Sequence, residues 1–199
     1  MTLQEFYETI KDCPKCAPLV ATRTQVVFGD GNPQAEIMFV GEAPGFYEDR
    51  QGKPFVGAAG KLLDRLLAEI GIQRRDVYIA NIIKCRPPDN RNPRTEEIEN
   101  CKPYLLTQID MIRPKVVCTL GNFSTQALLG KKVGISKVRG QAFSMGSYML
   151  IPMLHPAAAL HRETLLEAVK EDFRNLRKIL DQGVSAAASD PLPDQRPLF

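Results

Sequence analysis

The sequence predicts an α/β protein in which helices cover both faces of a four-stranded parallel sheet. Four short apolar segments, each of the length of a buried strand, alternate with segments whose apolar residues recur at helical spacing. This alternation is typical of βαβ units. The chain has 199 residues, of which 44% are hydrophobic, so it is long enough for one domain with a substantial core.

The first half of the chain contains two of these strands. Thr2 can cap a first helix over residues 3–10, with Glu5 completing a capping box. The apolar pattern then predicts a strand over 36–41, a helix over 60–70 that ends at Gly71, and a strand over 77–84.

The second half repeats the alternation. Thr95 is expected to cap the next helix, and Pro103 is expected to kink or split it, because proline removes a helical hydrogen bond. The pattern continues with a strand over 115–120, a short helix over 122–129, a strand over 148–153 and a long helix over 164–180.

Polar segments lie at the ends of three of the predicted strands. They are 41–45 (GEAPG) after the first strand, 81–86 at the end of the second, and 155–157 (HPA) after the fourth. Ligands of open parallel sheets bind outside the carboxyl ends of the strands. We therefore expect the functional site where these three segments meet.

Composition and charge limit the class of protein. The net charge of +3 does not by itself indicate a nucleic-acid-binding protein. No apolar run approaches the roughly 18–20 residues that span a bilayer, and the first residues lack the basic and apolar regions of a secretory signal. We therefore expect a cytoplasmic protein whose thiols stay reduced.

The cysteines predict a metal centre. Cys13 and Cys16 form a CPKC pair, and Cys85 and Cys101 form a second pair with fifteen residues between them. An odd total of five cysteines fits a metal centre with one spare better than disulfides. The spare, Cys118, lies in an apolar run and is expected to be a buried strand residue. Spacing does not separate zinc from an iron–sulfur cluster, although ligands from distant loops favour 4Fe–4S.

Residues at the expected site have structural as well as functional interpretations. The 41–45 turn either only connects two elements or directs backbone N–H groups at a ligand. Phe55 is either a core anchor or a stacking platform for a planar ligand. Asn81 interrupts an apolar strand and must be hydrogen-bonded to backbone or to a ligand. His155 is either structural or catalytic, whereas His161 is interpreted as a surface residue.

The motifs together resemble a known family. CPKC, VGEAPG, KPFVG, YIANIIKCRPP, LGN, KVRG and HPA closely resemble those of the family 4 uracil-DNA glycosylases, the iron–sulfur members of the uracil-DNA glycosylase superfamily. The resemblance covers residues 3–180. It implies a three-layer α/β/α sandwich around a four-stranded parallel sheet. It also implies a monofunctional hydrolase of base excision repair, which flips uracil out of DNA and cleaves its N-glycosidic bond to leave an abasic site.

The resemblance also implies the cofactor. A 4Fe–4S cluster would be held by Cys13, Cys16, Cys85 and Cys101. Its implied role is structural: it would pin the N-terminal helix and the basic loop over 86–94 near the DNA.

The uracil pocket implied by the resemblance contains three side chains. Phe55 would stack on the flipped base. Asn81 would donate to O4 and accept from N3–H, a pattern opposite to that of cytosine. His155 would donate to O2 as the base becomes an anion. Backbone N–H groups of the turn would assist it, namely those of Gly41, Glu42 and Ala43.

Two acidic residues are also expected in this pocket. Glu48 is interpreted as the wall that excludes the methyl group of thymine. Better-known relatives carry an aspartate that orients the attacking water where this chain has Ala43. Glu42 is our candidate for that role, with Glu48 second.

The expected DNA contacts come from three loops. Leu160 would fill the space left by the flipped base, and basic side chains would contact phosphates. These are Arg86, Lys137, Arg139 and Arg162. A relative that traps DNA covalently uses a histidine in a basic loop, and residues 86–94 contain none, so we expect turnover.

We divide the chain into a glycosylase domain over 1–182 and a flexible tail over 183–199. The last five residues, from Gln195 to Phe199, resemble the sliding-clamp-binding motif of bacterial repair proteins. The expected partners are uracil-containing DNA, single- or double-stranded, and this clamp. We expect a monomer without membrane attachment.

Two other functions compete with this interpretation. A non-catalytic nucleic-acid-binding domain could keep the fold and the cluster but should lack the set Phe55, Asn81 and His155. A zinc-dependent nucleotide-processing enzyme would lack the brown colour and the absorption at about 400 nm of an iron–sulfur protein.

Overall fold

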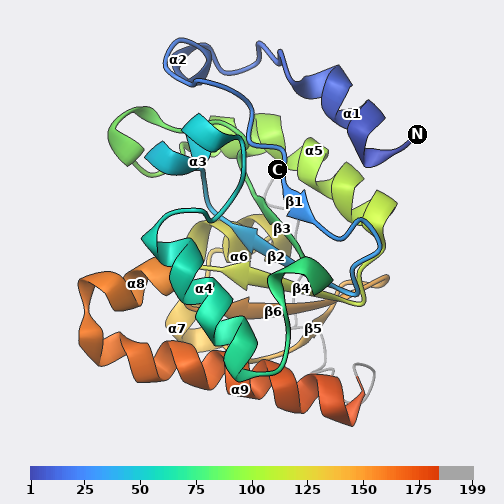
Figure 1. The fold of residues 1–199 in the computed structure, drawn as a ribbon, viewed down its shortest axis with the longest axis vertical. Coiled ribbons are helices and arrows are strands. Elements are labelled where there is room, and N and C mark those ends of the chain that lie inside the picture. Colours follow the sequence, from blue (N-terminus) through green and yellow to red (C-terminus); the bar gives the residue numbers. More distant parts are fainter. Residues whose placement is uncertain (184–199) are drawn as a thin grey trace.

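A six-stranded sheet lies between two layers of helices in the computed structural model of the chain (Figure 1). The structure describes residues 1–183, so residues 184–199 of the predicted tail, with the expected clamp-binding segment from Gln195 to Phe199, lie outside the described residues. Among the described helices, none has both the length and the apolar character needed to cross a membrane.

The four central strands are parallel, as predicted. Their order is β3 (Tyr78–Asn81), β2 (Ile37–Gly41), β4 (Val116–Leu120) and β6 (Met149–Met153). Every residue in them except Ile37 is buried. Strands covered on both faces have near-continuous apolar sequences, which is why the sequence pattern identified all four.

The prediction of a four-stranded sheet missed two edge strands. β1 (Asp30–Gly31) pairs antiparallel with β3, and β5 (Phe143–Ser144) pairs antiparallel with β6. Each has two residues, too few to show an alternating pattern. Gly31 passes so close to β3 that a Cβ there would lie 2.1 Å from the carbonyl oxygen of Val77.

The strand predicted over 77–84 ends earlier, at Asn81. The N–H groups of Ile82 and Ile83 donate to the carbonyls of Gly41 and Glu42, at 2.9 and 3.1 Å. The chain therefore bends out of the sheet while it stays buried. A buried bend and a buried strand have the same apolar pattern, so the sequence could not separate them.

Nine α-helices occur in the part of the chain that the structure describes. They are α1 (Leu3–Ile10), α2 (Ala17–Val20), α3 (Phe46–Gln51), α4 (Ala58–Glu69), α5 (Thr95–Ile112), α6 (Asn122–Leu129), α7 (Ile135–Val138), α8 (Pro156–His161) and α9 (Leu166–Gln182). Short 3₁₀ turns cover Arg74–Asp76, Pro88–Asn90 and Glu163–Leu165.

The helices form two layers, which confirms the α/β/α arrangement. Buried residues of α1, α5 and α6 pack on one face of the sheet, and those of α4 and α9 pack on the other. Successive residues of β2 alternate between the layers: Met38 and Val40 join the first, and Phe39 joins the second. There the ring of Phe39 stacks on Phe173, with centroids 6.0 Å apart.

Two local predictions are confirmed. At the start of α1, Thr2 Oγ1 accepts from the N–H of Glu5 at 3.2 Å, and the Glu5 carboxylate accepts from the N–H of Thr2 at 2.8 Å. The helix predicted over 122–129 is α6, and Gly130 ends it in the left-handed conformation.

The predicted cap of α5 is wrong, and so is the predicted split of the helix at Pro103. The cap is Arg94 rather than Thr95, and the Arg94 N–H donates to the buried carboxylate of Glu97 at 2.8 Å. Pro103 does not split the helix, which is continuous from 95 to 112. Pro103 lies on the exposed face, as does Glu99, so water can bind the Glu99 carbonyl that proline leaves unpaired.

Candidate functional site

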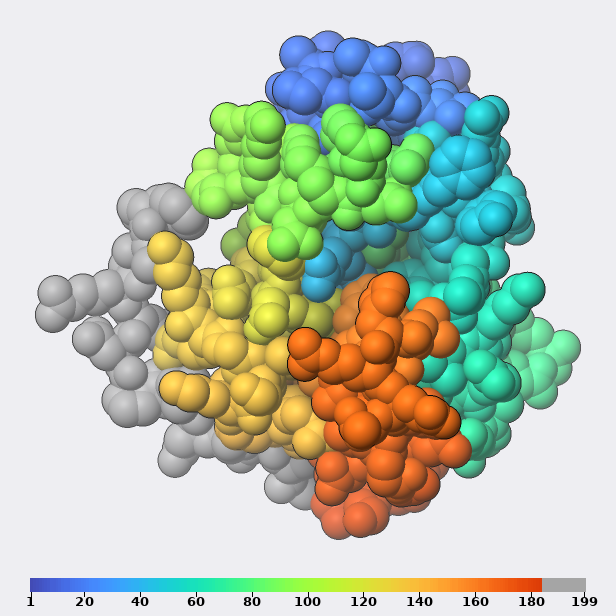
Figure 2. Space-filling model, turned by 90° about the vertical axis from the view of Figure 1, so that its left-hand side faces the viewer, coloured from blue at the N-terminus to red at the C-terminus, as the bar shows by residue number. Residues whose placement is uncertain are grey.

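The three polar segments meet at the carboxyl edge of the parallel strands, as predicted. Figure 2 shows this face: α3 (cyan), α8 (orange) and the loop before α5 (green) surround a hollow with the turn after β2 (light blue) at its floor. A Cβ on Gly41 would lie 2.4 Å from Asn81 Oδ1 and 2.7 Å from the Phe55 ring. Glycine at position 41 therefore lets the Asn81 side chain and the Phe55 ring approach the turn.

Asn81 ends β3 with a side-chain oxygen that has no protein partner. The residue is 2% exposed, and its Oδ1 is one of two buried side-chain polar atoms without a hydrogen bond among the described residues. A buried acceptor left unpaired costs about 1–3 kcal/mol. The structural interpretation, an amide bonded to neighbouring backbone, does not account for this atom. An incoming N–H group would satisfy it.

Phe55 has a strained backbone at the same site. Its φ is 52°, a left-handed value that is uncommon for residues other than glycine. The Phe55 ring is buried and lies 5.5 Å from the His155 ring, centroid to centroid, with an interplanar angle of 25°. Phe55 therefore belongs to the core and also lies beside His155, whereas its stacking on a planar ligand stays a prediction.

Two charged side chains, not visible from the sequence pattern, hold the Phe55 backbone in place. Arg74 donates to the carbonyls of Pro54 and Phe55 at 2.6 and 2.9 Å. From the other side, Glu48 Oε1 accepts from the N–H groups of Val56 and Gly57 at 2.9 and 2.8 Å. Glu48 thus braces the Phe55 loop, a contact that spacing alone could not predict.

A neighbouring glycine makes room for this arrangement. A Cβ on Gly60 would lie 1.8 Å from the Phe55 carbonyl oxygen. Any other residue at position 60 would push the Phe55 backbone out of its left-handed conformation.

His155 precedes α8 with one ring nitrogen already engaged. Its Nδ1 accepts from the N–H of Ala157 at 3.1 Å. Burial lowers the pKa of His155 to about 4, because the site disfavours the charged imidazolium. At neutral pH the ring is therefore neutral with its proton on Nε2, which makes Nε2 a hydrogen-bond donor.

Glu42, in the turn after β2, is also shifted toward its neutral form. Burial raises the pKa of Glu42 to about 7. A Cβ on Gly121, after β4, would lie 2.5 Å from Glu42 Oε1 and 3.4 Å from His155 Cβ. The side chains of Glu42 and His155 therefore both lie next to Gly121. A carboxyl group whose pKa is near 7 suits proton transfer to or from water.

The four paired cysteines line one small cavity, although they come from distant parts of the chain. Cys13, Cys16, Cys85 and Cys101 surround it with free thiols. No three of the described histidine, cysteine, aspartate or glutamate side chains are placed to hold a single metal ion. Cys118 is fully buried in β4, as expected for the spare thiol.

Each of these four sulfurs has a hydrogen-bond partner. Arg23 donates to Cys85 at 3.0 Å, the N–H of Lys84 donates to Cys101 at 3.2 Å, and Asn100 donates to Cys16 at 3.7 Å. The hydroxyl of Tyr104 lies 3.3 Å from Cys13 Sγ. Donors directed at three of the sulfurs and a hydroxyl group beside the fourth suit thiolates that bind a cluster.

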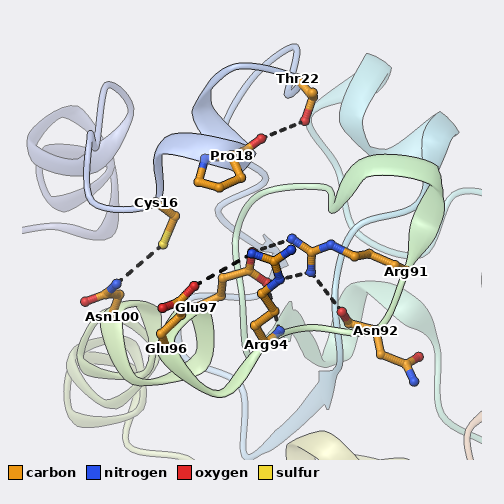
Figure 3. A network of polar contacts seen from close by, with 9 residues as sticks. All are labelled: Cys16, Pro18, Thr22, Arg91, Asn92, Arg94, Glu96, Glu97 and Asn100. Carbon is orange, nitrogen blue, oxygen red and sulfur yellow. Dashed lines mark hydrogen bonds and ion pairs between the residues drawn. The ribbon is translucent and has the colours of Figure 1, made fainter.

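The loop between Cys85 and Cys101 is fixed to α5 by a buried ion pair. Figure 3 shows Arg91 and the Arg94 backbone converging on Glu97, close to the contact between Cys16 and Asn100. Glu97 is buried, and its oxygens lie 2.5 and 2.9 Å from the Arg91 guanidinium. A charge-assisted, two-pronged pair of this kind is strong and directional.

The residues expected to contact DNA have different surroundings. Leu160 and Arg162 are exposed at the end of α8, and Lys137 is exposed in α7. Arg86 donates to Asn90 Oδ1 at 2.7 Å. Arg139 is held by α9, where its guanidinium lies 2.9 Å from Asp172 and 3.1 Å from Glu171, and it also donates to the Ala168 carbonyl. His161 is exposed, as expected.

The chain is similar to a family model and to several known proteins. The family model described as "Uracil DNA glycosylase superfamily" matches residues 28–180. A type-4 uracil-DNA glycosylase of Sulfurisphaera tokodaii is 46% identical over 187 residues, 89% of this chain and 84% of that protein. One of Saccharolobus solfataricus is 47% identical over 182 residues, 87% of this chain and 84% of that protein. One of Archaeoglobus fulgidus is 45% identical over 186 residues, 89% and 93% of the two chains.

Proposed function

Because the chain belongs to the type-4 uracil-DNA glycosylases of the uracil DNA glycosylase superfamily, we propose that it hydrolyses the N-glycosidic bond of uracil in DNA. The product is an abasic site for base excision repair. The observation that carries the proposal is the unpaired, buried Oδ1 of Asn81, which lies beside Phe55 at the edge where a ligand of this fold binds.

Recognition begins with extrusion of the base. Uracil inside a duplex cannot be reached, so it is flipped out at a cost of about a few kcal/mol. The flipped ring stacks against Phe55. Asn81 Oδ1 accepts from N3–H, and the amide nitrogen donates to O4. Cytosine offers the opposite pattern and would leave buried polar groups unpaired, which can discriminate by about 10⁴–10⁵.

Exclusion of thymine needs a steric wall, because one methyl group is worth only about 1–3 kcal/mol by attraction. We assign that wall to Glu48. Its carboxylate is fixed by the N–H groups of Val56 and Gly57, so it cannot move aside easily. The same fixation favours Glu42 over Glu48 as the group that orients water.

Bond breakage places negative charge on uracil and positive charge on the sugar. The Nε2–H of neutral His155 donates to O2 of the departing anion, helped by backbone N–H groups of the turn after β2. One such donor is typically worth about 2.7–4 kcal/mol. Because His155 is neutral beforehand, no proton has to be lost or gained for this contact to form.

Water then attacks the sugar carbon. The ionised carboxylate of Glu42 would accept a hydrogen bond from this water and later its proton. No histidine occurs in residues 86–94 to compete as a nucleophile, so each cycle ends with release of uracil and the abasic DNA.

The first prediction concerns Asn81 and His155. Replacing either by alanine should lower kcat/KM on uracil-containing oligonucleotides by about 100-fold or more, because each removes a hydrogen bond to the reacting base. Asn32→Ala is the control: Asn32 lines a cavity at the opposite, amino-terminal edge of the strands. Excision by Asn81→Ala and His155→Ala at the wild-type rate would remove both assignments.

The second prediction is a pH dependence set by Glu42. Ionisation of a carboxyl group with a pKa of about 7 should make kcat/KM fall as pH drops below 7, by about tenfold per unit. His155 stays neutral down to about pH 4, so its titration does not change the pH dependence of kcat/KM between pH 4 and 7. Glu42→Gln should be slower, and its kcat/KM should no longer fall below pH 7. If the fall below pH 7 persists in Glu42→Gln, it comes from the titration of another group.

We further propose that Cys13, Cys16, Cys85 and Cys101 hold a 4Fe–4S cluster. The shared cavity and the hydrogen-bond partner beside every sulfur support it. Held by these four residues, the cluster would have a structural role and would join the N-terminal segment to α5 and to the bend after β3.

The third prediction tests the cofactor. The purified chain should be brown, absorb at about 400 nm and contain about four iron atoms. Cys85→Ser should lose colour and iron, whereas Cys118→Ser should keep both, because Cys118 lies in β4 and does not line the cavity. A colourless protein with one bound zinc would contradict the cluster.

Uracil-containing DNA is the proposed partner, and we propose that exposed Lys137, Leu160 and Arg162 contact it together with Arg86. A phosphate contact by Arg139 stays a prediction, and its ion pairs with α9 give it a second, structural role. Binding of a sliding clamp by the segment from Gln195 to Phe199 and the monomeric state also stay predictions.

A further inference from the structure

Two large aromatic side chains are exposed at the start of α3. Phe46 is 44% exposed and Tyr47 is 61% exposed. Their rings meet edge to face, with centroids 5.5 Å apart and planes at 84°. The guanidinium of Arg50 lies 5.4 Å from the centroid of Phe46, and that of Arg86 lies 5.2 Å from it. The result is a cluster of two aromatic rings and two cations, here called the α3 platform.

The α3 platform adjoins the proposed uracil pocket. Helix α3 begins directly after the GEAPG turn. A Cβ on Gly57 would lie 3.8 Å from Tyr47 Cδ2 and 3.3 Å from Glu48 Oε1. Glu48 accepts from Val56 and Gly57, so the platform and the loop that presents Phe55 are joined and should keep a fixed separation. Helix α3 lies at the rim of the hollow in Figure 2.

Core packing does not explain these two rings. Neither Phe46 nor Tyr47 belongs to the two buried clusters of the domain. Exposed apolar residues are common singly, as with Val20 and Leu106. An adjacent aromatic pair with two arginines beside it is more specific. Arginine stacked on a ring still presents N–H groups to phosphate.

Aromatic rings and cations together match the chemistry of single-stranded nucleic acid. Proteins that bind such strands stack successive bases on aromatic side chains and contact the backbone with positive charges. In a duplex, the bases on either side of the extruded nucleotide remain paired and stacked. Those bases are available to an external ring only where the strand is unpaired.

We propose that Phe46 and Tyr47 form a stacking subsite for an unpaired base flanking the flipped uracil, with Arg50 and Arg86 contacting the adjoining phosphates. This inference rests on the proposed function. The substrate of the enzyme would then be uracil in a single-stranded or locally unpaired segment of DNA. Specificity for uracil stays with Asn81, and the platform adds affinity without reading sequence, because every base has a stacking face.

The test is a double-mutant cycle between Tyr47 and the neighbouring base. Binding is measured by fluorescence anisotropy with single strands carrying 2′-fluoro-deoxyuridine, whose glycosidic bond resists cleavage. A base-less spacer replaces the nucleotide on one side of the uracil or on the other. In the wild type, one of the two spacers should weaken binding about tenfold, the scale of one lost base–aromatic stack.

In Tyr47→Ala and Phe46→Ala, that same spacer should have little further effect, because its partner is already gone. Tyr47→Phe should restore the wild-type response, which shows that the variants act through the ring and not through unfolding. Leu106→Ala is the matched control, since Leu106 is an exposed apolar residue of α5 (38%) outside the platform. Its response to the spacers should be that of the wild type.

Equal weakening by Tyr47→Ala with and without the neighbouring base would overturn the subsite. A response seen only in the fully paired duplex would overturn the assignment to unpaired DNA. Failure of the wild-type protein to excise uracil would instead contradict the proposed function, so the two failures are distinguishable.

Discussion

A buried lysine connects the proposed uracil pocket to the cavity lined by the four cysteines. Lys84 is 1% exposed, and its ammonium donates to the Asn81 carbonyl at 3.0 Å and to Gln108 at 2.5 Å. Its N–H donates to Cys101 Sγ, and the next residue is Cys85. An ammonium group can be buried only with such partners. The five residues from Asn81 to Cys85 therefore carry both the amide that reads the base and a proposed ligand of the cluster. Displacing either would disturb the other.

The pocket disfavours charge on its two titratable side chains before substrate arrives. Burial shifts its two titratable side chains in opposite directions, the pKa of Glu42 up to about 7 and that of His155 down to about 4. A neutral imidazole is a donor that does not attract anions in the resting state. The base is neutral when it enters and anionic when it leaves, so the donated hydrogen bond strengthens as the bond breaks. Such differential binding is what accelerates a reaction.

Features that depend on neighbours in the sequence could be predicted, and features that depend on distant contacts could not. Buried strands and the α6 boundaries follow from local apolar patterns and glycines. The site itself followed from the topology, because polar segments after parallel strands must meet at one edge. The bracing of Phe55 by Arg74 and Glu48 could not be found, because each contact joins residues that no local pattern relates. The edge strands β1 and β5 were too short to show an alternating pattern in the sequence. Pro103 is tolerated inside α5 because it faces water.

The most direct measurement of the central claim is a crystal structure with free uracil bound. The account predicts that the pyrimidine lies against the Phe55 ring, that its N3–H donates to the otherwise unpaired Asn81 Oδ1, and that its O2 accepts from His155 Nε2. Uracil bound elsewhere, with Asn81 Oδ1 still lacking a partner, would contradict it.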